Sequence, residues 1–406
     1  MDKINILGIN ISNLGRGQVL EKIENYLARG GQRQIVTPNA EIILEAIGHD
    51  EELFFILNKA DLAVLDGSGP QLAALAIGHF IKRYPGADLL KDILALAEKR
   101  AKRVAVFNWR HGLSSAQEIR QALKKKYPKL EITVFEVERQ AVLAKHLLAQ
   151  AGDFKPDIIF STLGAPRQEK FIYHNLRKLP SAKLGMGVGG AFDFLTGRIR
   201  RAPKILRIIG LEWLWRLIKQ PWRIKRIYQA VIVFPCKFLA WRFVLPWLYR
   251  ANVVGLLFKR ENDKFKILIV ERTDSPGHWQ LPQGGTDGQS LAQAGERELR
   301  EEINTDKFKS VAVFSNLHQY EFGDSTGKFM VLAKARGYKG QVQGLFIAEF
   351  LGDNKDIKVN FWEHTAWRWV EAEKLVESVH PVRRPSAKIF MEKFEESVIS
   401  TVGRNL

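Results

Sequence analysis

The chain has 406 residues, 46% of them hydrophobic, so it is long enough for two or three domains and too apolar to be largely disordered. Its single cysteine, Cys236, excludes an intrachain disulfide framework and any zinc site built from cysteines, which suits a reducing compartment. The formal net charge of +18 predicts an anionic partner, which could be nucleic acid, lipid headgroups or a diphosphate substrate.

The first 200 residues alternate between short apolar runs and amphipathic stretches. The apolar runs, which we interpret as strands, are residues 34–37, 62–65, 104–107, 157–163 and 184–189. Helix-like stretches such as DLLKDILALAEKR lie between them. This alternation predicts an α/β fold with a Rossmann-like, open and mostly parallel sheet. The N-terminus leads into a strand without the long apolar core of a signal peptide, so we expect no export.

Polar residues follow several of the predicted strands. Thr37 and Asn39 come after the first, in VTPNAEI, and Asp66 comes after the second, in LDGSG. Arg83 stands in RYPGADLL, and Gln168 follows a later strand in LGAPRQEKFI. Each of them alone could be an ordinary turn, cap or surface residue. Because ligands of open parallel sheets bind beyond the carboxyl ends of the strands, their joint placement predicts one site at that edge.

The stretch from residue 198 to residue 250 is rich in Lys, Arg and aromatic residues and holds one acid, Glu212. This mixture is typical of nucleic-acid surfaces and of bilayer interfaces. No motif of the known nucleic-acid readers is present, and apolar runs such as FVLPWLY favour amphipathic helices that lie on a membrane. Lys237 and Arg242 interrupt the apolar run, which argues against a membrane span. A helical hairpin packed on the protein itself is the alternative.

The first 245 residues or so resemble the TagA/WecG/CpsF family of glycosyltransferases, glycosyltransferase family 26. The motifs that carry the resemblance occur in the family's order: VTPNAEI, DGSG, RYPGADLL, LGAPRQEKFI, GVGGAFDFLTGRIRRAP and GLEWLWRL. The family moves N-acetylmannosamine-type sugars from a UDP donor to a polyprenyl-diphosphate-linked sugar, with inversion and without a required metal. The resemblance implies cell-surface polysaccharide or teichoic-acid synthesis by a cytoplasmic enzyme, peripheral on the inner face of the bacterial plasma membrane.

The resemblance also assigns roles to the motif residues. It implies that Asp66 is the general base for the acceptor hydroxyl, and that Thr37, Asn39 and Gln168 belong to the sugar-nucleotide pocket. Arg83 is implied in handling the acceptor or the diphosphate. These roles suit an inverting transfer, which needs one carboxylate near the incoming hydroxyl and positive charge near the departing diphosphate.

Without a metal, that positive charge must come from arginines and helix N-termini. The resemblance implies this task for Arg216, Arg223 and Arg226, although a merely solvated basic face is the alternative. Two places depart from the family pattern: Asn108-Trp109-Arg110 stands where a glycine pair is usual, and the usual Gly-Tyr-Phe segment near residue 135 is not clear. Both concern the nucleotide side of the pocket, so the donor stays open.

From residue 250 onward the pattern changes to that of an α+β unit. Strands are predicted in VVGLLFKR, KILIVER, VAVFSN, KFMVLAKA, GLFIAEFL and WRWV, and a last helix around residues 389–397. A glycine loop, WQLPQGG, precedes the strongly charged helix SLAQAGERELREEI. On that helix Glu298 and Glu302 share one face, with Glu301 beside them. Like charges repel unless a cation sits among them, so we predict Mg²⁺ there; a solvated charged face is the alternative.

Residues 250–400 resemble Nudix hydrolases, which implies an α/β/α sandwich and hydrolysis of a nucleoside diphosphate derivative. The resemblance implies a phosphate loop made of Gly284, Gly285 and Arg297. It further implies metal ligation by Glu298, Glu301 and Glu302, with catalytic roles for Glu298 and Glu301. The box is one residue shorter than the family pattern, Gln289 stands where a bracing Glu belongs, and Asn304 replaces the closing glycine. We therefore expect a reshaped loop.

We thus expect a transferase core at residues 1–197, a membrane-associating appendage at 198–249 and a Nudix domain at 250–406. No nucleic-acid partner is expected, and a homo-oligomer is left open. One alternative is an RNA-binding Nudix pyrophosphohydrolase whose basic segment docks RNA. Another is a Nudix module that binds nucleotides without turnover, and a third keeps the transferase fold but not its catalysis.

Overall fold

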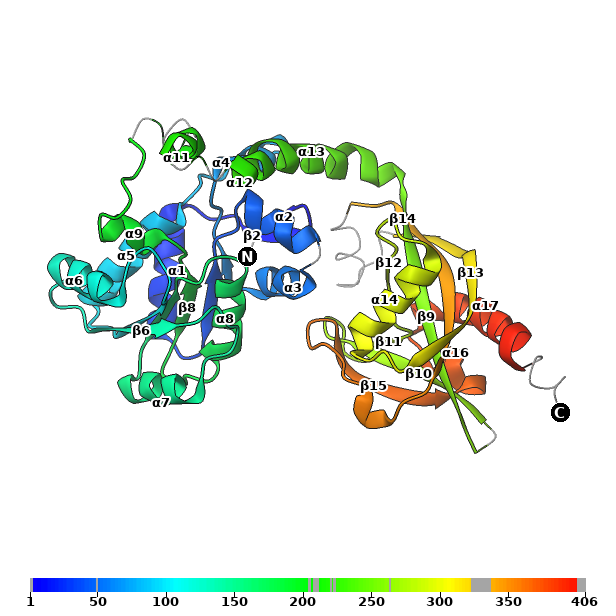
Figure 1. Ribbon diagram of the computed structural model, residues 1–406. Coiled ribbons are helices and arrows are strands. Elements are labelled where there is room, and N and C mark those ends of the chain that lie inside the picture. The colour runs from blue at the N-terminus through cyan, green and yellow to red at the C-terminus, as the bar shows by residue number, and fades with distance from the viewer. Residues whose placement is uncertain are drawn as a thin grey trace. The chain divides into compact units, whose positions relative to one another are not determined.

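The computed structural model describes residues 3–48, 50–203, 206, 212–219, 221, 224–262, 264–322 and 337–399. The chain forms two compact units, Met1–Leu239 and Ala240–Leu406. Each unit has its own large sheet with helices packed against it (Figure 1).

The first unit is built on a six-stranded sheet in the order β4-β3-β8-β7-β5-β6, with every neighbouring pair parallel. Its strands are β3 (Arg33–Val36), β4 (Leu62–Ala63), β5 (Val104–Trp109), β6 (Ile132–Val137), β7 (Ile158–Ser161) and β8 (Leu184–Gly187). A separate antiparallel hairpin joins β1 (Lys3–Ile6) to β2 (Ile9–Ser12). The predicted open parallel sheet is confirmed.

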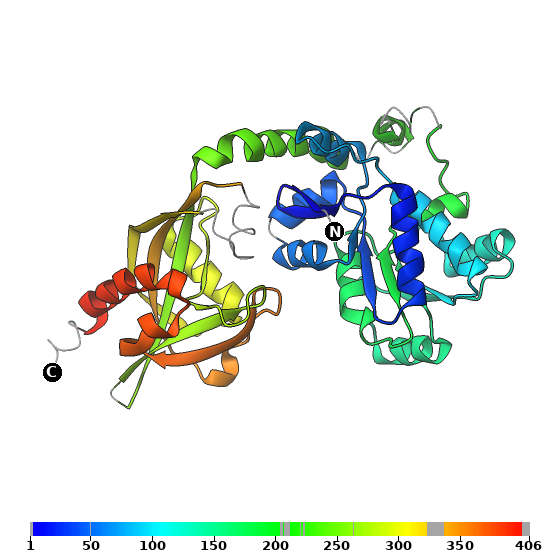
Figure 2. The same cartoon turned by 180° about the vertical axis from the view of Figure 1, so that it is seen from behind.

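Helices cover both faces of this sheet, as the views from the two sides show (Figure 1 and Figure 2). They are α1 (Arg16–Ala28), α2 (Ala40–Gly48), α3 (Glu51–Lys59), α4 (Ser68–Ala76), α5 (Gly86–Lys99), α6 (Ala116–Lys126), α7 (Lys145–Phe154), α8 (Arg167–Leu176) and α9 (Ala191–Leu195). Strand β5 illustrates the reason for helices on both faces, because its two faces are both buried. Val104 and Val106 face a core with α1, α5 and α6, whereas Ala105 and Phe107 face a core with α8. Side chains alternate across a strand, so a strand buried on both faces is apolar throughout.

The basic aromatic segment is helical over most of its described residues between 206 and 247. It contains α11 (Glu212–Lys219), α12 (Ile224–Tyr228), η2 (Gln229–Val233), α13 (Phe234–Leu239), η3 (Ala240–Val244) and η4 (Leu245–Trp247). Helix α13 packs on α4 and α2 through the buried rings of Phe234 and Phe238. The helix Ile224–Trp247 has 24 residues and is apolar enough to cross a membrane by length and composition, with 11% of its most apolar window buried. Lys237 and Arg242 therefore do not by themselves exclude a span.

The second unit has a seven-stranded sheet in the order β11-β10-β9-β14-β13, with β12 on β9 and β15 on β10. Its strands are β9 (Tyr249–Glu261), β10 (Lys264–Arg272), β11 (Trp279–Gln280), β12 (Gln283–Gly285), β13 (Phe308–Glu321), β14 (Gly340–Phe350) and β15 (His364–Glu371). The β9–β14 pair is parallel and the other described pairs are antiparallel. One strand predicted from sequence, KFMVLAKA, lies outside the described residues.

Helices lie on both faces of this second sheet. Helix α14 (Leu291–Ile303) buries Leu299 against Leu257 of β9, and α17 (Arg384–Phe394) buries Phe394 against Phe258 on the opposite face. Shorter helical pieces are η5 (Asn354–Asp356), η6 (Ala372–Lys374), α16 (Leu375–Ser378), η7 (Pro381–Arg383) and η8 (Glu395–Ile399). The helix–sheet–helix arrangement confirms the predicted α/β/α sandwich.

Candidate active sites

A cavity of about 1050 Å³ opens in the first unit beyond the carboxyl ends of its parallel strands. Its lining comes mainly from the segments that follow β3, β4, β7 and β8, together with the start of α5 and parts of the basic segment. Ligands of open parallel sheets bind in this position because loops and helix N-termini meet there. The cavity is therefore the candidate transferase site.

Asp66 and Thr37 lie together at the N-terminus of α5. The backbone N–H of Gly86 donates a hydrogen bond to Asp66 Oδ2 at 3.2 Å. A Cβ atom on Gly86 would lie 3.4 Å from Thr37 Oγ1 and 3.5 Å from Asp66 Oδ2, so all three groups share one corner of the cavity. The positive end of a helix favours a carboxylate in its ionised form, which is the form that a general base requires.

Asn39 and Gln168 also line the cavity, and both are held by backbone groups. Asn39 Oδ1 accepts a hydrogen bond from the N–H of Ile42 at 3.0 Å and so caps α2. The Oε1 atom of Gln168 accepts from the N–H of Gly189 at 2.7 Å, and a Cβ on Gly187 would lie 2.6 Å from the Gln168 side chain. Gln168 is therefore buried against the glycine wall of the cavity instead of being an ordinary surface residue.

The predicted arginines are distributed differently. Arg226 lines the cavity, and its Nε donates to Glu41 Oε2 at 2.7 Å. Arg83 is not among the residues that line the cavity. The side chain of Arg216 and the whole of Arg223 lie outside the described residues. Of the predicted residues, the structure thus brings Thr37, Asn39, Asp66, Gln168 and Arg226 to one cavity.

Several cavity residues were not predicted from the sequence. Lys or Arg side chains without an acidic partner in the described part of the chain are Arg139, Arg167, Arg200 and Lys225. Arg167 and Arg200 lie in the LGAPRQEKFI and GVGGAFDFLTGRIRRAP motifs, and Lys225 lies beside Arg226, so each had a usable signal, whereas nothing in the local sequence of Arg139 pointed to the cavity. A cavity with unmatched positive charge is suited to a phosphate-bearing ligand.

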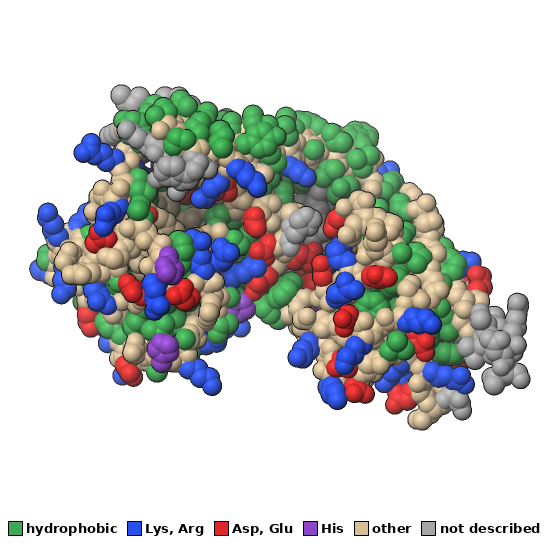
Figure 3. Space-filling view, viewed as in Figure 1, with side chains coloured by type: hydrophobic (Ala, Val, Ile, Leu, Met, Phe, Trp, Pro, Cys, Tyr) green, Lys and Arg blue, Asp and Glu red, His purple; other side chains and the backbone are tan. Residues whose placement is uncertain are grey.

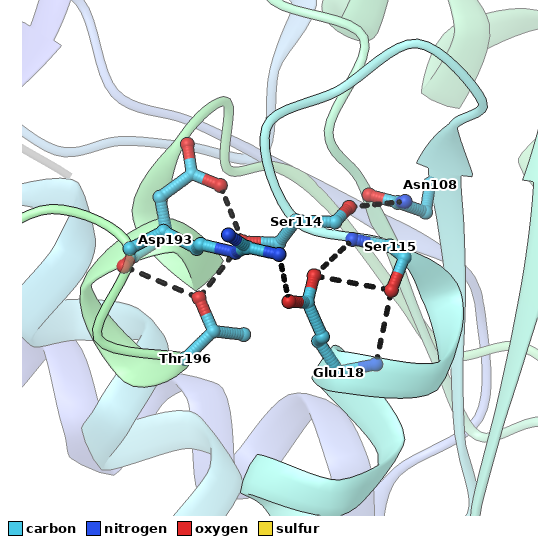
Figure 4. A network of polar contacts seen from close by, with 7 residues as sticks. Asn108, Ser114, Ser115, Glu118, Asp193 and Thr196 are labelled. Carbon is cyan, nitrogen blue, oxygen red and sulfur yellow. Dashed lines mark hydrogen bonds and ion pairs between the residues drawn. The ribbon is translucent and has the colours of Figure 1, made fainter.

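A buried polar network supports the rim of this cavity (Figure 4). Ser114 Oγ donates to Asp193 Oδ1 of α9 at 2.7 Å, and Asn108 Nδ2 donates to the carbonyl of Ser114 at 2.9 Å. Thr162 Oγ1 also donates to Asn108 Oδ1, at 2.9 Å. Asn108, one of the departures from the family pattern, therefore links the ends of β5 and β7 to the loop that leads to α6.

Glu169 stands directly behind Gln168 and is fully enclosed. Its Oε1 accepts from Gln168 Nε2 at 2.8 Å, while its Oε2 has no hydrogen-bond partner. Burial raises the pKa of the Glu169 carboxyl to about 7, against which the Gln168 hydrogen bond acts weakly. The carboxyl therefore fixes the direction of the Gln168 amide from inside the protein.

In the second unit, Arg297 of α14 holds the glycine loop. Its Nη2 donates to the carbonyl of Gly285 at 2.7 Å, and its Nε donates to Gln289 Oε1 at 2.8 Å. Gln289 thus contacts Arg297 from the position where the family pattern has a bracing Glu. The predicted loop residues Gly284, Gly285 and Arg297 do lie together, and a Cβ on Gly284 would overlap the Glu298 carboxylate unless that side chain moved.

The three glutamates do not converge in the described arrangement. Arg297 contacts Glu298 at 2.8 Å and Glu301 at 3.0 Å, whereas Glu302 accepts from the N–H of Gln283 and contacts His364 Nε2, each at 3.0 Å. Among the described residues no three His, Cys, Asp or Glu side chains form a group that could hold a metal. The cation between Glu298 and Glu301 is a guanidinium, so these side chains as they stand do not fit a shared Mg²⁺ site.

Comparison with known families divides the chain in two. Residues 4–246 match the glycosyl transferase WecG/TagA/CpsF family, and residues 248–394 match the NUDIX domain. One curated relative is the N-acetylglucosaminyldiphosphoundecaprenol N-acetyl-beta-D-mannosaminyltransferase of Bacillus subtilis (strain 168), which is 34% identical over 197 residues, or 48% of this chain and 74% of the relative. The enzyme of the same name from Staphylococcus aureus (strain MRSA252) is 31% identical over 242 residues, or 58% and 91%.

Among solved structures, a Caenorhabditis elegans Ap4A hydrolase binary complex is 19% identical with a TM-score of 0.27, covering 36% of this chain and 98% of that one. The Escherichia coli dihydroneopterin triphosphate pyrophosphohydrolase is 19% identical with a TM-score of 0.28, covering 36% and 99%. The family matches identify an enzyme with a transferase part and a Nudix hydrolase part. The chain belongs to the WecG/TagA/CpsF family of glycosyltransferases and carries a Nudix domain after its transferase region.

Proposed function

We propose that the first unit transfers an N-acetylhexosamine of the N-acetylmannosamine type from a UDP-sugar to a polyprenyl-diphosphate-linked acceptor, with inversion. The names of the Bacillus and Staphylococcus relatives support this reaction. The observation that carries the proposal is the Asp66 carboxylate, which lies beside Thr37 at the N-terminus of α5 in a cavity with unmatched cations.

In this proposal Asp66 removes the proton from the acceptor hydroxyl as that oxygen attacks the anomeric carbon of the donor. Gln168, Asn39 and Thr37 shape the donor pocket. Arg226, together with Arg216 and Arg223, provides positive charge for the departing diphosphate, and Arg83 handles the acceptor or the diphosphate. Side chains supply this charge without a metal in the transferase unit. Charge stabilisation of this kind acts on the leaving group in the transition state.

The test is a transfer assay with a panel of UDP-sugars and a short-chain lipid-diphosphate acceptor. Transfer from one donor that is lost in both Asp66→Asn and Asp66→Ala supports the proposal. Unchanged transfer in both variants would remove Asp66 from the role of base. Transfer from no UDP-sugar would reject the donor class.

We propose further that the chain is peripheral on the cytoplasmic face of the plasma membrane. Exposed apolar side chains on the basic segment support this, among them Tyr228 at 54% and Leu239 at 53% exposure. Hydrophobic side chains gather along α12 and α13 in Figure 3. Leu72 and Phe80, in and after the neighbouring α4, are 64% and 74% exposed and extend the apolar surface; sequence patterns did not indicate them.

Anionic and neutral liposomes test this placement. Sedimentation with anionic vesicles that is reversed by an alkaline carbonate wash supports peripheral binding, whereas resistance to that wash indicates a span. Preference for RNA over vesicles would favour the RNA-binding alternative. The division into residues 1–197, 198–249 and 250–406 is part of the same proposal, with the middle region as the membrane contact.

For the second unit we propose hydrolysis of a nucleoside diphosphate derivative. The NUDIX match and the contact of Arg297 with the glycine loop support it. A second candidate, nucleotide binding without turnover, is favoured by the separation of Glu302 from Glu298 and Glu301. Mg²⁺- or Mn²⁺-dependent release of UMP or AMP from nucleotide sugars and dinucleotides, lost in Glu298→Gln, would establish hydrolysis. Binding of these compounds without turnover would establish the alternative.

A further inference from the structure

Trp109, which lies in a segment that departs from the family pattern, contacts Arg139 at the ends of β5 and β6. Trp109 is the last residue of β5 and lies opposite Val137, the last residue of β6. Arg139 follows Val137 by two residues. The guanidinium carbon of Arg139 lies 3.4 Å from the centroid of a Trp109 ring, which is a close cation–π contact. The backbone N–H of Trp109 donates to Thr162 Oγ1 at 2.9 Å, so the aromatic platform is fixed to the end of β7.

Arg139 lines the cavity next to another cation. Arg167, the first residue of α8, also lines it and directly precedes Gln168. Burial lowers the pKa of the Arg139 guanidinium, and the positive charge of Arg167 lowers it further, so the two groups are close enough to repel. Glu138, the acid next to Arg139 in the chain, is engaged with Arg110 at 3.3 Å instead.

Arg139 and Arg167 line the same cavity, and neither has an acidic partner in the described part of the chain. Their mutual repulsion raises the free energy of the empty cavity. An anion between them would relieve that repulsion. A diphosphate suits the arrangement, because its several oxygens can accept hydrogen bonds from two planar guanidinium groups at once. A lone carboxylate or a neutral base would leave one of the two cations unmatched.

We infer that Arg139 and Arg167 form an anion subsite for the diphosphate of the nucleotide-sugar donor, and that Trp109 positions Arg139 for this contact. This inference rests on the proposed transferase function. Stacking restricts the otherwise mobile Arg139 side chain, so less entropy is lost when the donor binds. Trp109 is therefore a positioning residue.

The experiment compares UDP, UMP and uridine in two ways with the full chain. Inhibition of transfer reports on the transferase site alone, and calorimetry reports on direct binding. In Arg139→Ala and in Arg167→Ala we expect UDP to bind roughly tenfold or more weakly, because each loses a charge-assisted hydrogen bond. Uridine should change less than about twofold, since it carries no phosphate.

The matched control is Arg177→Ala, which removes an exposed arginine at the C-terminal end of α8 that does not line the cavity and should leave UDP binding unchanged. Trp109→Ala should weaken UDP about threefold and Trp109→Phe should largely restore it, because the aromatic face returns. A merely structural role for Trp109 would not separate UDP from uridine in this way.

Unchanged UDP affinity in both arginine variants would overturn the subsite. An equal loss of affinity for UDP and for uridine would also overturn it, because that loss would indicate a contact with the uracil or the ribose. If no UDP-sugar supports transfer, the proposed donor class fails. Calorimetry then still judges the subsite, with inorganic pyrophosphate as the probe. Loss of pyrophosphate binding in Arg139→Ala supports the subsite, and its absence in the unaltered chain rejects it.

Discussion

In the first unit, Arg139 and Arg167 line the cavity without an acidic partner in the described chain, whereas in the second unit Arg297 contacts both Glu298 and Glu301. Two carboxylates of the Nudix helix thus share one guanidinium, and the Glu302 carboxylate contacts His364 Nε2. Charge that the protein itself does not compensate indicates a site where an ion of opposite sign can bind. By this criterion the transferase cavity is suited to bind an anion. Glu298, Glu301 and Glu302 must first lose their contacts with Arg297 and His364 before they can bind a cation.

The largest expected effect concerns Asp66, the carboxylate that we propose as the general base of sugar transfer. Asp66→Asn keeps the shape of the side chain but removes the base, so kcat for sugar transfer should fall by roughly 10²–10⁴-fold. Asp153→Asn, on the exposed side of α7, is the matched control and should have wild-type kcat. A fall in apparent donor affinity with unchanged kcat would instead assign Asp66 to binding.

In the second unit, Arg297→Ala should have a different effect from the cavity variants, because Arg297 already pairs with carboxylates. Loss of the guanidinium leaves Glu298 and Glu301 without their shared cation, which should cost about 1–3 kcal/mol of unfolding free energy. Added Mg²⁺ should then raise the Tm of the variant more than that of the unaltered chain, because the carboxylates are released for metal. Arg300→Ala, on the exposed face of α14, is the control. Equal Mg²⁺ responses in all three proteins would contradict the idea that Arg297 competes with metal.

Glu169 gives a test of similar size that depends on pH. Its carboxyl has an ordinary pKa of 4.5, and burial raises the pKa to about 7 in the folded chain. Between these values the folded state keeps a proton that the unfolded state has released. The contribution of Glu169 to stability is therefore fully present below pH 4.5 and is lost as the pH rises to about 7, by about 3 kcal/mol.

Glu169→Gln should remove this slope and should be more stable than the unaltered chain at pH 8, since a neutral amide carries no desolvation penalty. Denaturant unfolding of the first unit at pH 4.5, 6 and 8 measures the effect, with Glu136→Gln as an exposed control. Parallel pH profiles for Glu169→Gln and the unaltered chain would mean that the carboxyl titrates near its ordinary value.

The smallest effect concerns the end of the Nudix helix. Asn304 caps α14 with φ of 57°, a left-handed conformation that Asn and Gly tolerate better than other residues. Asn304→Ala should cost about 1 kcal/mol, whereas Asn304→Gly should be nearly neutral. Thermal unfolding distinguishes the two. Equal losses in both variants would show that the Asn side chain, and not the backbone angle, stabilises the end of the helix.

The sequence by itself determined both folds, because alternating strand and helix patterns depend on local spacing and on burial along one element. It also located Thr37, Asn39, Asp66 and Gln168 at one edge of a sheet, since the carboxyl ends of parallel strands meet there. The Gln289 and Asn304 substitutions were visible too. The structural consequences of these two substitutions could not be predicted from the sequence. They depended on whether the Gln289 amide could replace a carboxylate at Arg297 and whether Asn304 could adopt a left-handed backbone conformation.

Only the tertiary structure decided how charges pair. Arg139 and Trp109 are 30 residues apart in sequence and meet because β5 and β6 are neighbours in the sheet. Arg297 contacts two glutamates and His364 reaches Glu302 from β15, so the carboxylates that indicated a metal already have partners within the protein. Local sequence spacing places residues on a face of an element, but the partner of a charge is chosen by side chains that arrive from distant parts of the chain.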